Sequence, residues 1–357
     1  MEVLLMLRLR RSVLKGTLAA GAAGLLSGGA ASATATTSAA SQQRAAHGPA
    51  RAPVAPAPLT MRWLGVAGWE LTFGGGDTAT GPRRVLFDPY FSRMRCLNAD
   101  GKLDPSLPLR LDETAVAEAA RARLTGAPEL ILVSHGHFDH LADVPRLLAH
   151  PEWRDHRIRT LCDDSSRHLL TALGAPEKRV ADVITVRGGE YLQFDGFTVQ
   201  VFRSLHSQGA DHGYFAPGRL VAPPPTRPTT LGELPEGETL MYAVTVEEGP
   251  TVLLSGASNY IARELAGLRP DVAVVGMTSH SAVHGYLERL LEVLGDPPLL
   301  IPSHHDDMVS PLTAARVDSA AAAALSTAVS ARPTAPRTRV LDPRPYEPLD
   351  ITAALST

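Results

Sequence analysis

Short apolar runs recur along the chain between Met61 and Ile301, separated by turn residues or by segments with helical spacing. Runs that are continuously apolar, or that alternate with polar residues, predict strands at 61–73, 84–87, 130–133, 158–161, 183–186, 190–194, 197–202, 240–246, 251–254, 271–275 and 299–301. Helical spacing and capping residues predict helices at 112–124, 141–149, 165–173 and 282–294. This mixture of strands and helices is typical of the α/β class.

The apolar run at 130–133 leads directly into the sequence Ser-His-Gly-His-Phe-Asp-His. Residues two apart in an extended segment face the same side, so His135 and His137 can point at one centre. Asp139 and His140 follow within one turn and can serve a second centre nearby. Imidazole and carboxylate groups are good ligands for zinc and similar ions. A solvated polar loop would be the simpler alternative, but the position at a strand end favours a metal site.

This motif resembles the His-x-His-x-Asp-His signature of the metallo-β-lactamase-fold hydrolases, and the resemblance extends over roughly Met61 to Met308. It implies a four-layer αβ/βα sandwich, in which two mixed sheets pack face to face with helices outside. The metals would then lie at the strand ends along one edge. The predicted ligands all stand at strand ends, which fits that arrangement.

The resemblance also implies two metal positions. His135, His137 and His206 would hold one ion, and Asp139, His140 and His304 would hold the other. The cofactor would be one or two divalent ions, with zinc favoured and manganese or iron left open. His304 is preferred over its neighbour because it completes a Pro-x-His pattern after the strand at 299–301.

Two further positions bear on the implied metal site. Asp88, in an Asp-Pro pair after the strand at 84–87, is a candidate partner for a ligand histidine, or else a simple turn residue. Ala257 stands where the family pattern has a metal-bridging aspartate, and the following Asn259 offers only a neutral carbonyl oxygen. We hypothesise that the second ion binds more weakly, or that the site favours anionic substrates such as phosphodiesters.

The function that the resemblance implies is hydrolysis by a metal-bound hydroxide, which would cleave a phosphodiester, ester or lactone bond. Asp139 would orient the hydroxide as well as bind metal. We expect His305 to donate the proton that the leaving group needs, with His280, His284 and Asp306 as further candidates. The resemblance is nearest to the branch that holds N-acyl-phosphatidylethanolamine phospholipase D and the ascorbate-phosphate lactonase. The alternative is a catalytically impaired metal- or ligand-binding protein of the same fold, which Ala257 would support.

The front of the chain has the pattern of an export signal. Residues 10–15 read Arg-Arg-Ser-Val-Leu-Lys and look like a twin-arginine signal, which is followed by a mild apolar run and an Ala-Ser-Ala cleavage pattern. A membrane anchor is the alternative. We expect a signal peptide at 1–33, a linker rich in Ala, Pro and Ser at 34–58, the hydrolase domain at 59–345 and a tail at 346–357. The mature protein would be extracellular, periplasmic or associated with the cell wall, with no stable membrane insertion.

The formal net charge of −3 and the absence of a basic run argue against nucleic acid as a partner, and so against a nuclease of this fold. The expected partner is a small-molecule or lipid-like substrate, with an anionic one left open, and the oligomeric state is not determined by the sequence. Cys96 and Cys162 could pair after export or remain free. The proline-rich segment 210–238 is expected to form a lid or a substrate wall, to which His212 and Tyr214 could contribute.

Overall fold

The computed structural model describes residues 57–74, 81–314, 317–333 and 337–357. Its internal contacts divide the chain into residues 1–52 and 53–357, and every described residue belongs to the second unit. The expected signal peptide and all but the last two residues of the expected linker lie outside the described residues. Within the described part of the chain, no helix is both long enough and apolar enough to cross a membrane.

The described residues form two seven-stranded mixed sheets. In the first sheet, β3, β4, β5 and β6 run parallel, whereas β14, β1, β2 and β3 pair antiparallel. Its strands, in spatial order, are β14 (Pro348–Asp350), β1 (Leu59–Gly65), β2 (Gly68–Phe73), β3 (Arg83–Phe87), β4 (Leu130–Leu132), β5 (Arg159–Cys162) and β6 (Val183–Thr185).

The second sheet has the same division into a parallel and an antiparallel half. Strands β10 to β13 run parallel, and β7, β8, β9 and β10 pair antiparallel. Its spatial order is β13 (Arg339–Val340), β12 (Leu299–Ser303), β11 (Val272–Gly276), β10 (Thr251–Ser255), β9 (Leu240–Val246), β8 (Phe197–Arg203) and β7 (Tyr191–Phe194).

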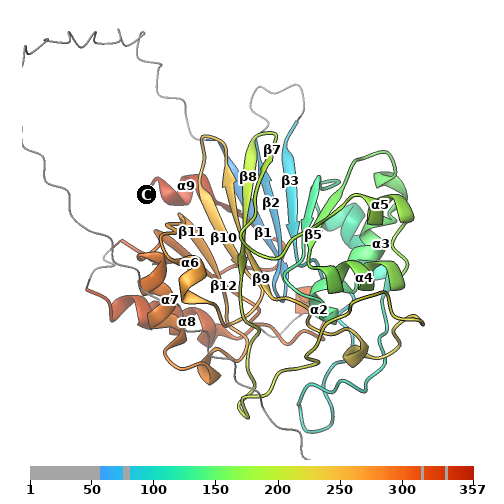
Figure 1. The fold of residues 1–357 in the computed structure, drawn as a ribbon. Helices are drawn as coiled ribbons and strands as arrows, with labels where there is room; N and C mark the ends of the chain where they lie inside the picture. The colour runs from blue at the N-terminus through green and yellow to red at the C-terminus, as the bar shows by residue number, and fades with distance from the viewer. Residues whose placement is uncertain (1–56, 75–80, 315–316, 334–336) are drawn as a thin grey trace, which may run out of the picture. The chain divides into compact units, whose positions relative to one another are not determined.

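The sheets pack face to face around a shared apolar core (Figure 1). The rings of Phe73 and Phe197, one from each sheet, lie 5.2 Å apart, and the Tyr242 hydroxyl donates to the Val133 carbonyl at 2.7 Å. On β4, Leu130 and Leu132 face this core while Ile131 faces the helices outside. Both faces of the strand are therefore buried, which explains why its sequence is apolar without alternation.

Helices cover the outer face of each sheet (Figure 1). The first sheet is covered by α1 (Glu113–Glu118), the π-helical turn Ala119–Arg123, α2 (Phe138–Leu141), α3 (Val144–Leu148), α4 (Asp164–Ala172) and α5 (Glu177–Ala181). The second is covered by α6 (Ala262–Leu265), α7 (Tyr286–Leu294) and α8 (Ser319–Ser330). Short 3₁₀ turns occur at Pro151–Trp153, Leu231–Glu233, His280–Ala282 and Leu312–Ala314, and α9 (Ile351–Leu355) follows β14. The predicted four-layer α/β sandwich is confirmed.

One predicted boundary was wrong. Residues 346–357, expected to be a tail, contribute β14 and α9, and the Ile351 side chain is fully buried in the inter-sheet core. Leu349 pairs with Met61 across the edge of the first sheet. A three-residue edge strand carries no periodicity of its own, so its pairing partner at the other end of the chain decides its structure.

The two cysteines are both buried and free. Burial raises the pKa of the Cys96 thiol to about 12 and that of Cys162 well above its ordinary value. Both side chains therefore act as small apolar groups in the helix-facing core of the first sheet.

Asp143, at the start of α3, links that helix to the segment after β3. Its carboxylate accepts bonds from the Phe91 and Ser92 backbone N–H groups at 2.6 and 2.8 Å and from the Ser92 hydroxyl at 2.5 Å. Complete burial nevertheless raises the pKa of Asp143 to about 6, against the effect of these bonds. Between pH 3.8 and about 6 the folded protein therefore binds more protons here than the unfolded chain.

We expect this group to lower the stability of the protein as pH rises through that window. Its contribution is fully present below pH 3.8 and is lost above about pH 6, a difference of about 3 kcal/mol in the free energy of unfolding. Chemical denaturation between pH 4 and 7 would measure it. An Asp143→Asn variant should lack this component of the pH dependence, and an unchanged pH profile in the variant would contradict the assignment.

Candidate metal centre

The predicted ligand residues all follow strand ends at one edge of the sandwich. His135 and His137 follow β4, His206 follows β8 and His304 follows β12. The chain after β4 turns at once into α2, whose first turn carries Asp139 and His140. Side chains from both sheets therefore meet at the same edge, as expected when strands end side by side.

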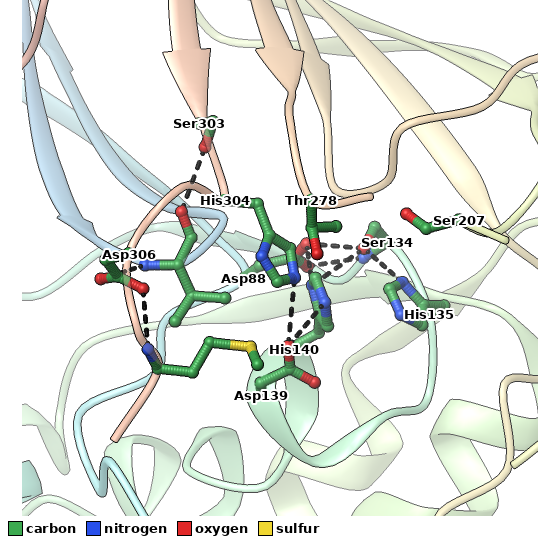
Figure 2. Close-up of polar contacts among 12 residues, drawn as sticks. Asp88, Ser134, His135, Asp139, His140, Ser207, Thr278, Ser303, His304 and Asp306 are labelled. Carbon is green, nitrogen blue, oxygen red and sulfur yellow. Dashed lines mark hydrogen bonds and ion pairs between the residues drawn. The ribbon is translucent and has the colours of Figure 1, made fainter. Parts of the chain in front are cut away.

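The structure brings all six residues together in the two groups that the resemblance implies. One ligand atom from each of His135, His137 and His206 lies within 4.8 Å of the others, and the same holds for Asp139, His140 and His304. The groups adjoin, because the ring centroids of His135 and His140 are 3.9 Å apart. In the second group, Asp139 Oδ2 lies 3.3 Å from His140 Nε2 and 3.2 Å from His304 Nε2 (Figure 2).

Protein partners occupy one ring nitrogen in each histidine of the first group. His135 Nδ1 lies 2.8 Å from the Ser134 hydroxyl, His137 Nε2 lies 3.3 Å from the Ala216 carbonyl, and His206 Nδ1 lies 2.8 Å from the Ser207 carbonyl. These contacts leave His135 Nε2 and His206 Nε2 available to a ligand. Such outer partners fix the tautomer and the orientation of ligand histidines.

His135 Nε2 is buried and has no hydrogen-bond partner. A buried polar atom without a partner is costly and needs an explanation. A cation held by His135, His137 and His206 would satisfy this atom. The donor set, the convergence and this unpaired nitrogen all fit a metal ion, although the binding itself remains a prediction.

Asp88 occupies the position that a partner of a ligand histidine needs. Its Oδ2 lies 2.7 Å from His140 Nδ1 and accepts from the Ser134 hydroxyl at 2.6 Å, and its Oδ1 accepts from the Ser134 N–H at 2.7 Å (Figure 2). Asp88 is therefore more than a turn residue. A β-carbon at Gly256 would lie 2.2 Å from the Ser134 hydroxyl oxygen, so glycine is required where β10 ends against this pair.

Burial and charge give the two groups different protonation behaviour. Burial lowers the pKa of His135 and of His206 well below the ordinary value, and it lowers the pKa of His137 to about 4. These three rings are therefore neutral at pH 7, the form that binds metal. Burial would also lower the pKa of His140, but the carboxylates of Asp139 and Asp88 raise it to about 10.

Asp139 is the carboxylate of the second group. Burial alone would raise its pKa, but His140 and His304 outweigh that effect and hold the pKa well below its ordinary value. At pH 7 the second group therefore pairs the Asp139 carboxylate with a cationic His140, whereas the three rings of the first group are neutral.

The segment around Ala257 supplies no replacement for a bridging carboxylate. Asn259 Oδ1 accepts from the Tyr260 N–H at 2.9 Å, and its side-chain amide donates to the His206 carbonyl at 3.4 Å. The Ser258 N–H donates to the Ser207 hydroxyl at 2.9 Å. Ala257 thus lies between two residues that contact the supports of the site. Gly256 packs against Asp88. Ser258 bonds to Ser207, the residue after His206.

The candidates for proton donation are not part of either ligand group. His305 is buried and stacks on Trp63 with ring centroids 4.6 Å apart, and its role stays a prediction. Asp306 is buried and pairs with Arg93 at 2.9 Å. His280 Nδ1 faces the Met277 carbonyl at 2.8 Å, beside a surface groove of about 480 Å³ that His284 also lines.

The segment 210–238 forms one wall of the site. The Phe215 ring lies 5.3 Å from that of His137, and the Tyr214 ring lies 6.4 Å from that of His206. The Gly136 N–H donates to the Glu236 carbonyl at 2.7 Å, which ties this segment to the loop that carries the predicted ligands His135 and His137. Tyr214 and His212 are both exposed, and of the two it is Tyr214 whose ring lies beside a predicted ligand histidine. The Ala216 carbonyl beside His137 was missed, because a backbone contact between distant loops leaves no mark in the sequence.

A Gly136→Ala substitution is expected to lower the hydrolysis that the resemblance implies by about tenfold to a hundredfold. The added β-carbon would lie 2.3 Å from the Pro235 carbonyl oxygen, so the wall or the flanking histidines must move, and small displacements of reacting groups have effects of this size. Steady-state kinetics would measure the loss. The matched control is Gly196→Ala, where φ is +82° and no atom lies within 4 Å of the added carbon. Equal losses in both variants would contradict this interpretation.

Comparison with known proteins gives a consistent result. Residues 83–305 match the family model described as "Beta-lactamase superfamily domain". A "UPF0173 metal-dependent hydrolase" of Sulfurisphaera tokodaii is 27% identical over 148 residues, which cover 41% of this chain and 50% of that protein. One of Azorhizobium caulinodans is 25% identical over 153 residues, which cover 43% and 51%. The chain thus spans about half the length of the curated relatives it matches.

Two solved structures are similar in fold. The metallo-beta-lactamase fold protein YhfI from Bacillus subtilis has a TM-score of 0.48 and 14% identity, over 82% of this chain and 99% of that one. A possible metal-dependent hydrolase from Veillonella parvula has a TM-score of 0.45 and 14% identity, over 83% and 100%.

Proposed function

The chain belongs to the beta-lactamase superfamily, and on this basis we propose that it is a metal-dependent hydrolase that holds two divalent ions in the adjoining ligand groups. The observation that carries the proposal is the pair of groups itself, whose nearest rings are 3.9 Å apart and which leave His135 Nε2 buried and unpaired. The curated relatives are named metal-dependent hydrolases, which supports the same conclusion.

Each part of the site then has a task. His135, His137 and His206 would hold one ion, and Asp139, His140 and His304 the other. Bound divalent ions supply a water that is activated near neutral pH and stabilise negative charge on the substrate. Asp139, ionised and in contact with both histidines of its group, would orient the attacking water. Phe215 and Tyr214 would limit access of bulk water from one side.

The charge of the site supports an anionic small-molecule substrate. The six ligands contain one carboxylate, and Asp88 adds a second negative charge behind His140. Two divalent ions would therefore leave a net positive charge that a phosphodiester could neutralise. We propose phosphodiesters first, with esters and lactones as further substrates, and zinc as the first metal to test.

A second candidate is a metal- or ligand-binding protein of this fold that has lost catalysis. Ala257 favours it, because Asn259 is already occupied by its neighbours and cannot replace a bridging carboxylate. Bound metal without turnover on any of the three substrate classes would support this candidate.

The test compares protein stripped by a chelator with protein reconstituted with zinc or manganese. We expect the stripped protein to be inactive on phosphodiester, ester and lactone panels and to recover activity when metal is added. Activity that is unaffected by complete metal removal would contradict the proposal.

Export by the twin-arginine route is a separate proposal, supported by the sequence of residues 10–15 and the cleavage pattern at 31–33. Replacing Arg10 and Arg11 by lysine should retain the protein in the cytoplasm. Mass spectrometry of the mature N-terminus would locate the cleavage site, and an unprocessed chain in the cell would contradict the proposal.

A further inference from the structure

His304 has a backbone conformation that residues other than glycine rarely adopt. Its φ is +54°, directly after the end of β12. Three residues in the contacts around it share this property, Val66 with φ +48°, Arg93 with φ +46° and Met308 with φ +58°. Such conformations persist only where the surrounding contacts hold them in place, and they concentrate at functional sites.

The backbone of Val66 holds the turn at His304. The His304 N–H donates to the Val66 carbonyl at 2.7 Å, and the Ser303 hydroxyl donates to the same oxygen at 3.2 Å. The indole N–H of Trp63 makes a third bond to it at 3.0 Å. The position of His304 is therefore set by the bend between β1 and β2, in the opposite sheet.

The Asp306 carboxylate fixes that bend from the other side. Its Oδ2 accepts from the Val66 N–H at 3.1 Å, and its Oδ1 accepts from the Met308 N–H at 3.1 Å (Figure 2). The Arg93 guanidinium pairs with Asp306 Oδ2 at 2.9 Å and also donates to the Ser310 carbonyl at 2.8 Å. The Asp306 side chain is fully buried and that of Arg93 nearly so.

We propose that the Arg93–Asp306 ion pair is a positioning device for His304, and that it is required to hold an ion in the second ligand group. The inference rests on the proposed function. Neither residue is a ligand in this account. Both act through Val66, whose carbonyl oxygen accepts the hydrogen bond from the His304 N–H.

The geometry makes this requirement specific to one group. Asp139 and His140 come from α2, beside the first sheet, whereas His304 comes from the end of β12 in the second. The 3.2 Å approach of His304 Nε2 to Asp139 Oδ2 therefore depends on how the two sheet edges are held together. The first group has its own supports in Ser134, Ser207 and Ala216, and none of these contacts involves Arg93 or Asp306.

The experiment measures zinc and cobalt(II) bound per chain by equilibrium dialysis, with the free metal set by a chelator. Wild type should bind about two ions. Asp306→Asn and Arg93→Met should each bind one ion normally and the second about tenfold to a hundredfold more weakly. Arg93→Lys keeps the charge with less disturbance and should show a smaller loss in the same direction.

The matched control is Asp296→Asn. Asp296 also has a positive φ, of +56°, and it pairs with Arg332 in a partly buried ion pair after α7. This variant should lose stability but keep both ions. A double-mutant cycle separates positioning from general destabilisation: in a His304→Ala background, Asp306→Asn should cause no further loss of metal.

The possible outcomes distinguish the two claims. A wild type that binds no metal would refute the proposed function, and the positioning role with it. A wild type with two ions, together with an Asp306→Asn variant that binds both ions as tightly, would overturn the positioning role alone. Two other results would also overturn it. One is weaker binding of both ions to the same extent, and the other is an additive loss of bound metal in the His304→Ala background.

Discussion

Replacement of Asp139 by asparagine is expected to lower hydrolysis by about a thousandfold and to weaken the second ion. Asp139 is the one carboxylate among the six ligand residues, and its Oδ2 contacts both His140 and His304. Asparagine keeps the shape but removes the charge. An ion contributes several kcal/mol of charge stabilisation, and about 4 kcal/mol corresponds to about a thousandfold in rate.

Kinetics and metal content should be measured on the same Asp139→Asn preparation. Asp143→Asn is the matched control, because Asp143 is a second buried carboxylate four residues further on that bonds to Phe91 and Ser92 instead of the histidines. The control should keep its metal and most of its activity. If Asp139→Asn retained both ions and wild-type turnover, Asp139 could not have the role that we assign to it.

Replacement of Asp88 by asparagine is expected to weaken metal binding by about tenfold to a hundredfold, the usual effect of losing the partner of a ligand histidine. Asp88 Oδ2 accepts hydrogen bonds from both the Ser134 hydroxyl and His140 Nδ1. An amide cannot accept bonds at both of its ends, so either the Ser134 N–H or one of these two groups would lose its acceptor. A buried polar group left without a partner also costs about 1–3 kcal/mol of stability.

Competition with a chromophoric chelator would measure this change in affinity. Asp271→Asn is a suitable control, because Asp271 accepts a backbone N–H from Thr251 at 2.7 Å at the start of β10, the opposite end of that strand from Gly256. The control should lose some stability and no metal affinity. Equal metal affinity in Asp88→Asn and wild type would show that His140 does not depend on Asp88 for its orientation.

Much of the site could be predicted from the sequence because its chemistry is local. Four of the six predicted ligand residues stand within six positions after a buried strand, and Asp88 directly follows another strand end. His206 and His304 were found only because a resemblance indicated which strand ends to examine. The positions of the central strands along the chain followed from apolar runs, which the structure buries on both sides.

The remainder depends on contacts between distant segments. Strand β14 forms because Leu349 meets Met61, and nothing in its three residues requires it. Two further contacts join segments that lie far apart in the chain. One is between the Ala216 carbonyl and His137, and the other is the ion pair of Arg93 with Asp306. Interpreted from the sequence, Asp306 was a candidate acid, whereas in the structure it is a buried partner of Arg93. Only the fold determines which acidic residue near a site is available for chemistry.

Metal binding is tested most directly by the metal content of the chain, measured by plasma mass spectrometry on protein purified without chelators. We expect about two divalent ions per chain, held by the group of His135, His137 and His206 and the group of Asp139, His140 and His304. A chain that retains no metal, even after zinc or manganese is added, would show that these residues do not form a metal centre.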